Sequence, residues 1–262
     1  ELYYHSFINL RLYFKNFSLD EVEKLGVLIV ILSVVIPIVV LCVIHYKNKK
    51  LYRKNLELIE TVTNLNRGTN SERDLILKLL KNGIPPQTIF HDLIVKKRNN
   101  KFSQADIVLA TTQGIIVIEV KSYGGWIFGN GNHTNWTQVM AYGEEKYRFY
   151  NPIKQVKSQI SSLKDRLDQF DNIPFFSVIV FCGSCRLKEI NYVPEKTYVV
   201  KPHRLNEVLN LIMDNNPPAP YTNKQEVVDV LKEAVSNGSN IDYQKQHIAN
   251  IKNFVGKHRI LK

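Results

Sequence analysis

Two carboxylates and a lysine, placed in two neighbouring apolar segments, are the residues whose types and spacing could carry chemistry. The segments 105–110 and 115–121 are typical of two strands joined by a short polar turn. In a symmetric hairpin over that turn, paired positions add up to 225, so Asp106 lies opposite Glu119. Lys121, two residues further, projects from the same face. Like charges that face each other destabilise a sheet, and a buried, unpaired carboxylate is costly.

A divalent cation would resolve that conflict. Mg²⁺ or Mn²⁺ takes carboxylate oxygens and keeps several waters, so Asp106 and Glu119 are candidate metal ligands. Such a metal polarises a phosphoryl oxygen and generates hydroxide near neutral pH. Lys121 could orient or help to deprotonate the attacking water, or stabilise charge on the phosphate. The alternative is an edge hairpin whose Glu119 and Lys121 point into solvent and carry no chemistry.

Two further polar residues fall where they could support this site. Glu72 begins a segment with helical periodicity and stands three and four residues before the apolar Leu75 and Ile76, so it leans toward the core. A glutamate that complements the helix dipole is the other interpretation. Gln155 lies near the start of the helix expected after Asn151, where it either contacts the site or faces solvent.

A basic run precedes the strand that carries Asp106. Its members are Lys96, Lys97, Arg98 and Lys101. They are either a solvated loop or a contact for a nucleic-acid backbone that reads no sequence.

These residues together resemble a known family. The ordered set is Glu72, Gln104-Ala-Asp106, Ile118-Glu119-Val-Lys121 and Asn151-Pro-x-x-Gln155, with Gly124-Gly125 and Trp136 also fitting. It is similar to the nuclease-related domain (NERD) of the PD-(D/E)xK nuclease superfamily, over roughly residues 65–170. The resemblance implies a mixed α/β fold, with a restriction-endonuclease-like mixed sheet flanked by helices, and Mg²⁺-dependent phosphodiester hydrolysis. It also implies that Asp106 and Glu119 bind metal, that Lys121 serves the water, and that Glu72 and Gln155 support the site.

The elements that must position this site follow from periodicity. Helices are expected after a cap at Thr69 or Ser71 and from Pro152 to Phe170, with three more near the C-terminus at 205–213, 225–235 and 243–254. Beyond the hairpin, strands are expected at 88–95, 136–140, 147–149, 175–181 and 197–200, and the glycine-rich 124–131 as a connection. Strands interleaved with helices indicate one α/β or mixed α+β domain. We expect residues 68–175 to form the nuclease-like part and 176–262 to complete it.

Residues 25–44 form a different kind of segment. They are 20 residues without a charge, long enough as a helix to span a bilayer, and Pro37 is tolerated in such a helix. Residues 1–24 are then a short external segment, 25–46 the transmembrane helix and 47–67 a basic juxtamembrane helix or linker. Lysines and arginines crowd the C-terminal flank, which predicts a single-pass protein of the cell membrane with its large C-terminal part in the cytoplasm.

The charge of the chain supports this division. The net charge is +11, from 35 Lys+Arg against 24 Asp+Glu, and the excess lies entirely after residue 46. Three cysteines exclude a disulfide framework. Cys182-Gly-Ser-Cys185 has the spacing of a metal or redox motif but follows an apolar strand, so two small residues at a strand end are expected there.

The sequence therefore predicts a membrane-anchored, metal-dependent nuclease acting on nucleic acid, DNA rather than RNA. A homodimer is one expected assembly, because metal nucleases that cut both strands often pair. The alternatives are a catalytically inactive, membrane-tethered nucleic-acid-binding protein and a structural membrane adaptor whose positive charge attracts acidic lipids.

Overall fold

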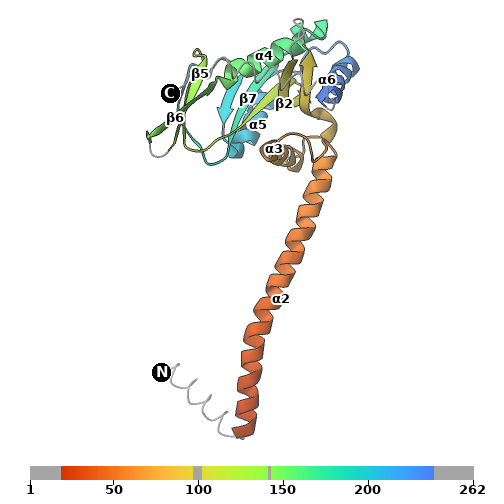
Figure 1. Ribbon diagram of the computed structural model, residues 1–262. Coiled ribbons are helices and arrows are strands. Elements are labelled where there is room, and N and C mark those ends of the chain that lie inside the picture. Colours follow the sequence, from red (N-terminus) through yellow and green to blue (C-terminus); the bar gives the residue numbers. More distant parts are fainter. Residues whose placement is uncertain (1–18, 97–101, 141–142, 239–262) are drawn as a thin grey trace, which may run out of the picture. The chain divides into compact units, whose positions relative to one another are not determined.

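The structure is a computed structural model that describes residues 19–96, 102–140 and 143–238 (Figure 1). The chain divides into two compact units, residues 1–55 and 56–262. Most of the predicted external segment, residues 1–18, and the helix expected at 243–254 lie outside the described residues.

The first unit is dominated by one helix, α2 (Leu19–Glu60). It contains Pro37 without a break, and residues 47–60 of the predicted juxtamembrane segment belong to the same helix. The apolar side chains between Val27 and Ile44 are exposed. By length and composition α2 is able to cross a membrane, which is the arrangement that would cover this apolar surface.

The second unit is built on a five-stranded sheet. Its strands are β1 (Ile89–Lys96), β2 (Phe102–Thr111), β3 (Gly114–Ser122), β7 (Phe175–Cys182) and β9 (Thr197–Val200), in the order β1-β2-β3-β7-β9. The first three strands are antiparallel, and β3, β7 and β9 are parallel. The strands are rich in Ile and Val and almost continuously buried, as expected of a sheet covered on both faces.

A smaller four-stranded sheet continues from the first. Its strands are β4 (Trp126–Asn130), β5 (Asn135–Met140), β6 (Glu145–Tyr150) and β8 (Arg186–Asn191), in the order β6-β5-β4-β8. Three residues join β3 to β4, and three join β7 to β8. Gly125 makes the first bend with φ of 71°, and a Cβ there would collide with the carbonyl oxygen of Val139.

Helices cover both faces of the five-stranded sheet (Figure 1). The helices α4 (Pro152–Lys164) and α6 (Lys224–Gly238) share one buried cluster with the inner side of the small sheet. The helices α3 (Asn70–Lys81) and α5 (Leu205–Asn215) pack on the opposite face. Short 3₁₀ turns at Pro86–Thr88, Asp168–Asp171 and Pro202–Arg204 connect the elements.

Side-chain caps fix the two helices that flank the hairpin. The Thr69 hydroxyl accepts a hydrogen bond from the backbone N–H of Glu72, which confirms the first of the two expected caps. Asn151 caps α4 by accepting from the N–H of Ile153. Its side-chain amide donates to the carbonyl oxygen at the end of β4 and to two carbonyl oxygens of the β4–β5 connection. The start of α4 is thereby tied to the small sheet.

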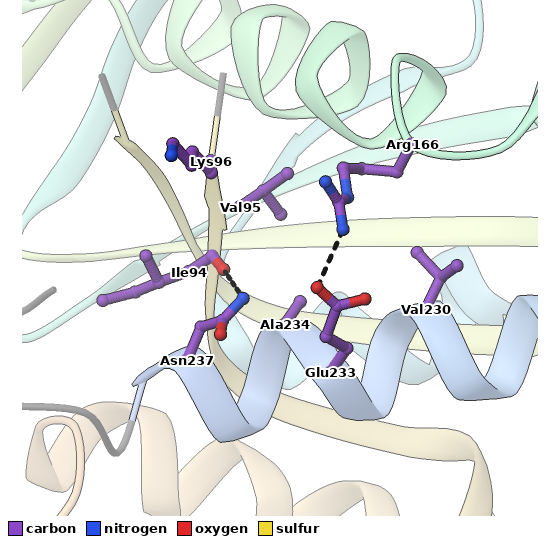
Figure 2. A pocket seen from close by; sticks show the side chains of 8 residues that line it. All are labelled: Ile94, Val95, Lys96, Arg166, Val230, Glu233, Ala234 and Asn237. Atoms are coloured by element: carbon purple, nitrogen blue, oxygen red, sulfur yellow. Dashed lines mark hydrogen bonds and ion pairs between the residues drawn. The ribbon is translucent and has the colours of Figure 1, made fainter. Parts of the chain in front are cut away.

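The edge strand β1 is covered by α6. Figure 2 shows the amide of Asn237 donating to the carbonyl oxygen of Ile94, at 3.4 Å, beside an ion pair of 2.8 Å between Arg166 and Glu233. The space enclosed there is only about 10 Å³, which is at the lower limit for one water molecule. This region is a joint between elements and not a ligand site.

The expected mixed α/β class, with a mixed sheet flanked by helices, is confirmed. Two strands were not expected, because β4 lies in the glycine-rich stretch and β8 is a short polar segment. The expected helix from Pro152 to Phe170 is too long, since α4 ends at Lys164 and a 3₁₀ turn follows. Its apolar period continues into Leu167 and Phe170, which pack against the core from a non-helical backbone.

The boundary at residue 56 leads to a prediction about truncation. A fragment that begins at residue 65 loses Ile59, which is 5% exposed, and the hydrogen bond from Thr63 to His91. Burial of one such side chain is worth roughly 1.5–3 kcal/mol, and the bond about 1 kcal/mol. We therefore expect residues 65–262 to melt roughly 5–15 °C below residues 56–262 in a thermal denaturation measured by circular dichroism.

The control is the fragment 56–262 carrying both Ile59→Ala and Thr63→Ala, which should melt close to the shorter fragment. Equal melting temperatures for the two wild-type fragments would show that residues 56–64 do not belong to the folded unit.

Candidate functional site

The site lies where the β2–β3 hairpin opens. The ladder pairs Ile107 with Ile118, which is the register expected from the sequence. The ladder ends at this pair, so Asp106 and Glu119 are not paired as the sequence predicts. Glu119 faces α4, and Asp106 lies close enough to Glu119 and Glu72 for their charges to raise its pKa. Beyond the ladder, the Asp106 Oδ2 accepts a hydrogen bond of 2.7 Å from the backbone N–H of Val120 on β3.

Glu119 is 1% exposed and is held from two directions. Its Oε1 accepts from Lys121 Nζ at 2.5 Å, and its Oε2 accepts from Gln159 Nε2 at 2.7 Å. Lys121 Nζ also donates to Gln155 Oε1 at 3.0 Å. Gln155 and Gln159 are one turn apart on α4, so this helix presents a pair of amides to the hairpin. Gln155 therefore contacts the site and does not merely face solvent.

The charges of the site are unbalanced in a specific way. Burial raises the pKa of the Asp106 carboxyl well above its ordinary value, and the nearby charges of Glu119 and Glu72 raise it further. Burial alone would lower the pKa of Lys121, but the Glu119 carboxylate outweighs it, so the net shift is upward. The lysine thus stays protonated, and Asp106 is the group that would gain from an added cation.

The donor set suits a hard cation. Two carboxylates, Asp106 and Glu119, are the kind of ligand that Mg²⁺ uses together with waters and phosphate oxygens. Gln159 Oε1 is buried without a hydrogen-bond partner next to Glu119, and a water bound to a cation could donate to it. Within residues 19–96, 102–140 and 143–238, no three His, Cys, Asp or Glu side chains form a group that could hold a metal by themselves.

Glu72 belongs to a chain of buried hydrogen bonds. Its Oε2 lies 2.9 Å from His91 Nε2, its Oε1 accepts from Thr69 at 2.8 Å, and His91 Nδ1 lies 2.7 Å from the Thr63 hydroxyl. Burial would raise the pKa of Glu72, but the hydrogen bonds from His91 and Thr69 outweigh it and lower the pKa. Glu72 is therefore an ionised carboxylate that acts electrostatically on Asp106. The Glu72 side chain is buried, as expected from its position, and its backbone N–H donates to the capping Thr69 hydroxyl.

Asp92 is a buried carboxylate that sequence reasoning missed. It lies on β1 across from Asp106, with a left-handed φ of 56° that is unusual for a residue other than glycine. Its Oδ2 accepts from Arg67 Nε at 3.0 Å, and its Oδ1 accepts from Gln104 Nε2 at 2.7 Å. Gln159 also donates to the Gln104 carbonyl oxygen, at 2.7 Å. These contacts connect the start of the domain, β1, β2 and α4 around the carboxylates.

Some of these residues could have been found in the sequence. Gln159 follows Gln155 by one helical turn, and His91-Asp92 interrupts an otherwise apolar strand. Both are visible patterns. The contribution of Arg67 depends on a contact across 25 residues and leaves no local signal.

Other candidates from the sequence are placed as follows. Lys96 is exposed at the end of β1, whereas Lys97, Arg98 and Lys101 lie outside the described residues. Trp136 is a core residue, 1% exposed and stacked on Phe181 with a centroid separation of 5.9 Å.

The Cys182–Cys185 motif ends an apolar strand, as expected. Both thiols are free and buried, and burial raises the pKa of Cys182. Lys201 Nζ donates to the carbonyl oxygens of Gly183 and Cys185 and lies 3.4 Å from the Cys185 sulfur. The motif therefore stabilises the bend between β7 and β8.

Comparison with known proteins identifies the part of the chain that carries these residues. Residues 67–182 match the family model of the nuclease-related domain, NERD. The chain is also 24% identical over 186 residues to an uncharacterized protein of Bacillus anthracis, an alignment that covers 70% of this chain and 83% of that protein. No solved structure matches. All the side chains that surround Glu119 fall inside the matched range.

The raised pKa of Asp106 predicts how stability depends on pH. The unfolded carboxyl ionises near pH 4, but the folded one holds its proton to a higher pH, so the native state loses stability as pH rises between these two values. Asp106→Asn keeps an acceptor for the Val120 N–H and removes the charge. Without divalent metal we expect it to raise the melting temperature at pH 7, by about 2–4 °C per kcal/mol gained, and to change little at pH 4.

The measurement is a melting series of the full chain in neutral detergent with a chelator, from pH 4 to pH 8. Asp214→Asn, an exposed carboxylate on α5, is the matched control and should shift nothing. A variant Asp106→Asn that is less stable than wild type at pH 7 would contradict the assigned charge imbalance.

Proposed function

Because residues 67–182 form a nuclease-related domain, we propose that this protein is a divalent-metal-dependent nuclease that hydrolyses phosphodiester bonds and is anchored to a membrane by α2. The observation that carries the proposal is that half-buried Asp106 and buried Glu119 lie near each other where the β2–β3 ladder ends, with the ammonium of Lys121 bound to Glu119. Two carboxylates that share one ammonium keep a negative charge that is not balanced, which favours occupation by a cation. Structural ion pairs do not need this imbalance.

Asp106 and Glu119 are the residues that would hold the metal, Mg²⁺ or Mn²⁺. When bound, such an ion supplies Lewis acidity toward a phosphoryl oxygen and lowers the pKa of a coordinated water. The buried, unpartnered oxygen of Gln159 would hold that water in place through a hydrogen bond.

Lys121 supplies positive charge to the site. Its raised pKa keeps the ammonium protonated, which suits it to stabilise negative charge on the phosphate and makes it a poor base. Gln155 holds Nζ at 3.0 Å, so the ammonium has a fixed position even if Glu119 turns toward a metal. Of the roles open to Lys121, charge stabilisation and orientation of water are therefore the ones we assign.

Glu72 has a positioning role in the proposal. Its hydrogen bonds to Thr69 and His91 orient the carboxylate, and its negative charge helps to keep the pKa of Asp106 high. The negative charges of three carboxylates would thus attract a cation to the site, and two of these residues, Asp106 and Glu119, would be its ligands.

The membrane location rests on α2 and on the residues that follow its apolar part. Lys47, Lys49, Lys50, Arg53 and Lys54 lie on the C-terminal side of that part, and positive flanks stay in the cytoplasm. The domain that begins at residue 56 would then act on cytoplasmic nucleic acid, with DNA as the first candidate substrate. A position of this domain on the external side of the membrane would contradict the proposal.

The direct test is cleavage by the full chain in neutral detergent. Labelled DNA and RNA should be cut with Mg²⁺ or Mn²⁺ and not with a chelator. Asp106→Ala and Lys121→Ala should each lower the rate by roughly 10²-fold or more, because each removes charge needed in the transition state. Melting curves of the same samples show that the variants are folded.

Lys232→Ala, an exposed lysine on α6, is the matched control and should cut at the wild-type rate. If wild type cuts neither DNA nor RNA but still binds them, the chain is a catalytically inactive nucleic-acid-binding protein. Unchanged cleavage in both site variants would place the chemistry elsewhere.

A further inference from the structure

The small sheet has two faces of different character. On the inner face Ile127, Trp136 and Phe149 pack into the core together with Leu187. On the other face the pairing registers place Trp126, Phe128, Thr137, Val139, Lys146, Arg148, Arg186 and Glu189, and Lys188 at the β4–β8 irregularity. We call this set the outer face.

The outer face is strongly basic. Its cations Lys146, Arg148, Arg186 and Lys188 are all exposed, and they come from strands at both edges of the sheet. Among the residues that the structure describes, none of the four forms an ion pair. Glu189 is the carboxylate on this face. Unpaired cations on a rigid sheet indicate an anionic partner, since charges that only solubilise a surface are normally mixed in sign.

Aromatic rings lie among these cations. Trp126 and Phe128 are half-buried, on the same strand and the same face. Lys188 Nζ lies 5.0 Å from the centre of the Trp126 ring, so the face of this ring is reached from the surface. A planar base could stack there, with the ammonium moving to the adjoining phosphate.

A polar hollow lies at one end of the outer face. It has a volume of about 300 Å³ and is lined by His133, Thr134, Asn135, Thr137 and Arg148. These side chains supply hydrogen-bond donors and acceptors and no negative charge. The hollow is large enough for a base or a sugar, and its arginine matches a phosphate.

The outer face is also close to the candidate site along the chain. Lys121 and Trp126 are five residues apart, which limits the distance between their Cα atoms to about 17 Å. The connection between them is fixed, because Gln138 donates to the Gly124 carbonyl oxygen at 2.9 Å. A ligand on the outer face would therefore have a defined position relative to the metal ligands.

We propose that the outer face of the β6-β5-β4-β8 sheet binds single-stranded nucleic acid, with bases on Trp126 and in the hollow and phosphates on the four cations. This inference rests on the proposed nuclease function, because it names the form of the substrate. The half-buried aromatic rings of this face favour a single strand over a duplex, whose bases are already stacked on one another, and over a phospholipid surface, which has no planar rings to stack.

Binding in a chelator tests the proposal without cleavage. Fluorescence anisotropy with the full chain in neutral detergent should show single-stranded DNA and RNA oligonucleotides binding more tightly than a duplex of equal length. Trp126→Ala should weaken binding of the single strands roughly 10-fold. The double variant Arg148→Ala, Lys188→Ala should flatten the dependence of log Kd on log salt, by about 0.7 for each phosphate that the protein no longer neutralises.

The double variant Lys81→Ala, Lys232→Ala removes the same charge from other surfaces and is the matched control. Because both replaced residues of the test variant are exposed, that variant is expected to fold even if Trp126→Ala does not. Wild-type affinity in it would overturn the proposal. Tighter binding of duplex, or binding of anionic vesicles with no binding of single strands, would overturn it as well.

Single-strand binding without metal-dependent cleavage would leave this inference standing while the nuclease proposal fails. Metal-dependent cleavage together with unchanged single-strand binding in the outer-face variants would support the nuclease proposal and overturn this inference.

Discussion

The repulsion between Asp106 and Glu119 is the interaction to which the surrounding elements are adapted. The β2–β3 hairpin brings the two carboxylates close together on adjacent strands, where burial removes the water that would screen them. Several neighbours offset part of the cost, whereas Glu72 adds to it. Lys121 and Gln159 bind Glu119, and the Val120 N–H binds Asp106. The proposed cation would complete the set, so the contacts that lower the cost of folding would also prepare the site for metal.

The position of α4 follows from this requirement. The helix begins at a cap that is tied to the small sheet through Asn151, and it runs across the hairpin so that Gln155 and Gln159 reach the carboxylate face. Amides are suited to this role because they donate to a carboxylate without adding a formal charge. A lysine at position 159 would reduce the charge imbalance at Asp106, and with it the negative charge that the proposed divalent ion would balance.

Local patterns in the sequence were sufficient for the hairpin and not for its surroundings. Alternation and a symmetric turn specify the register from Ile107–Ile118 to the turn, because a slip of one residue would turn the apolar side chains outward. They do not show that the ladder ends before Asp106. The strand β4 was not predicted, because Gly129 and its neighbours are typical of a loop. It is a strand because β5 and β8 pair with it on both sides, and a pairing with residues 186–191 has no local signature.

Backbone strain on β1 was equally hidden. Asp92 adopts a left-handed conformation because Arg67 and Gln104 hold its carboxylate from two directions. The histidine beside it reaches Glu72 and Thr63. The polar pair His91-Asp92 in an apolar strand indicates a buried hydrogen-bond network. The partners of the pair could be identified only from the fold. The segment that follows α2 thus takes part in the arrangement around the site.

The order of the strands along the chain has a consequence for how the domain assembles. The β2–β3 hairpin is local and closes early, whereas β7 and α4 come later in the sequence and dock across long loops. The two acids are therefore forced together before the amides of α4 arrive to hold them. This places an electrostatic barrier on the folding route itself. Divalent ions in a refolding mixture would lower that barrier, so the ion proposed for hydrolysis would also speed formation of the folded domain.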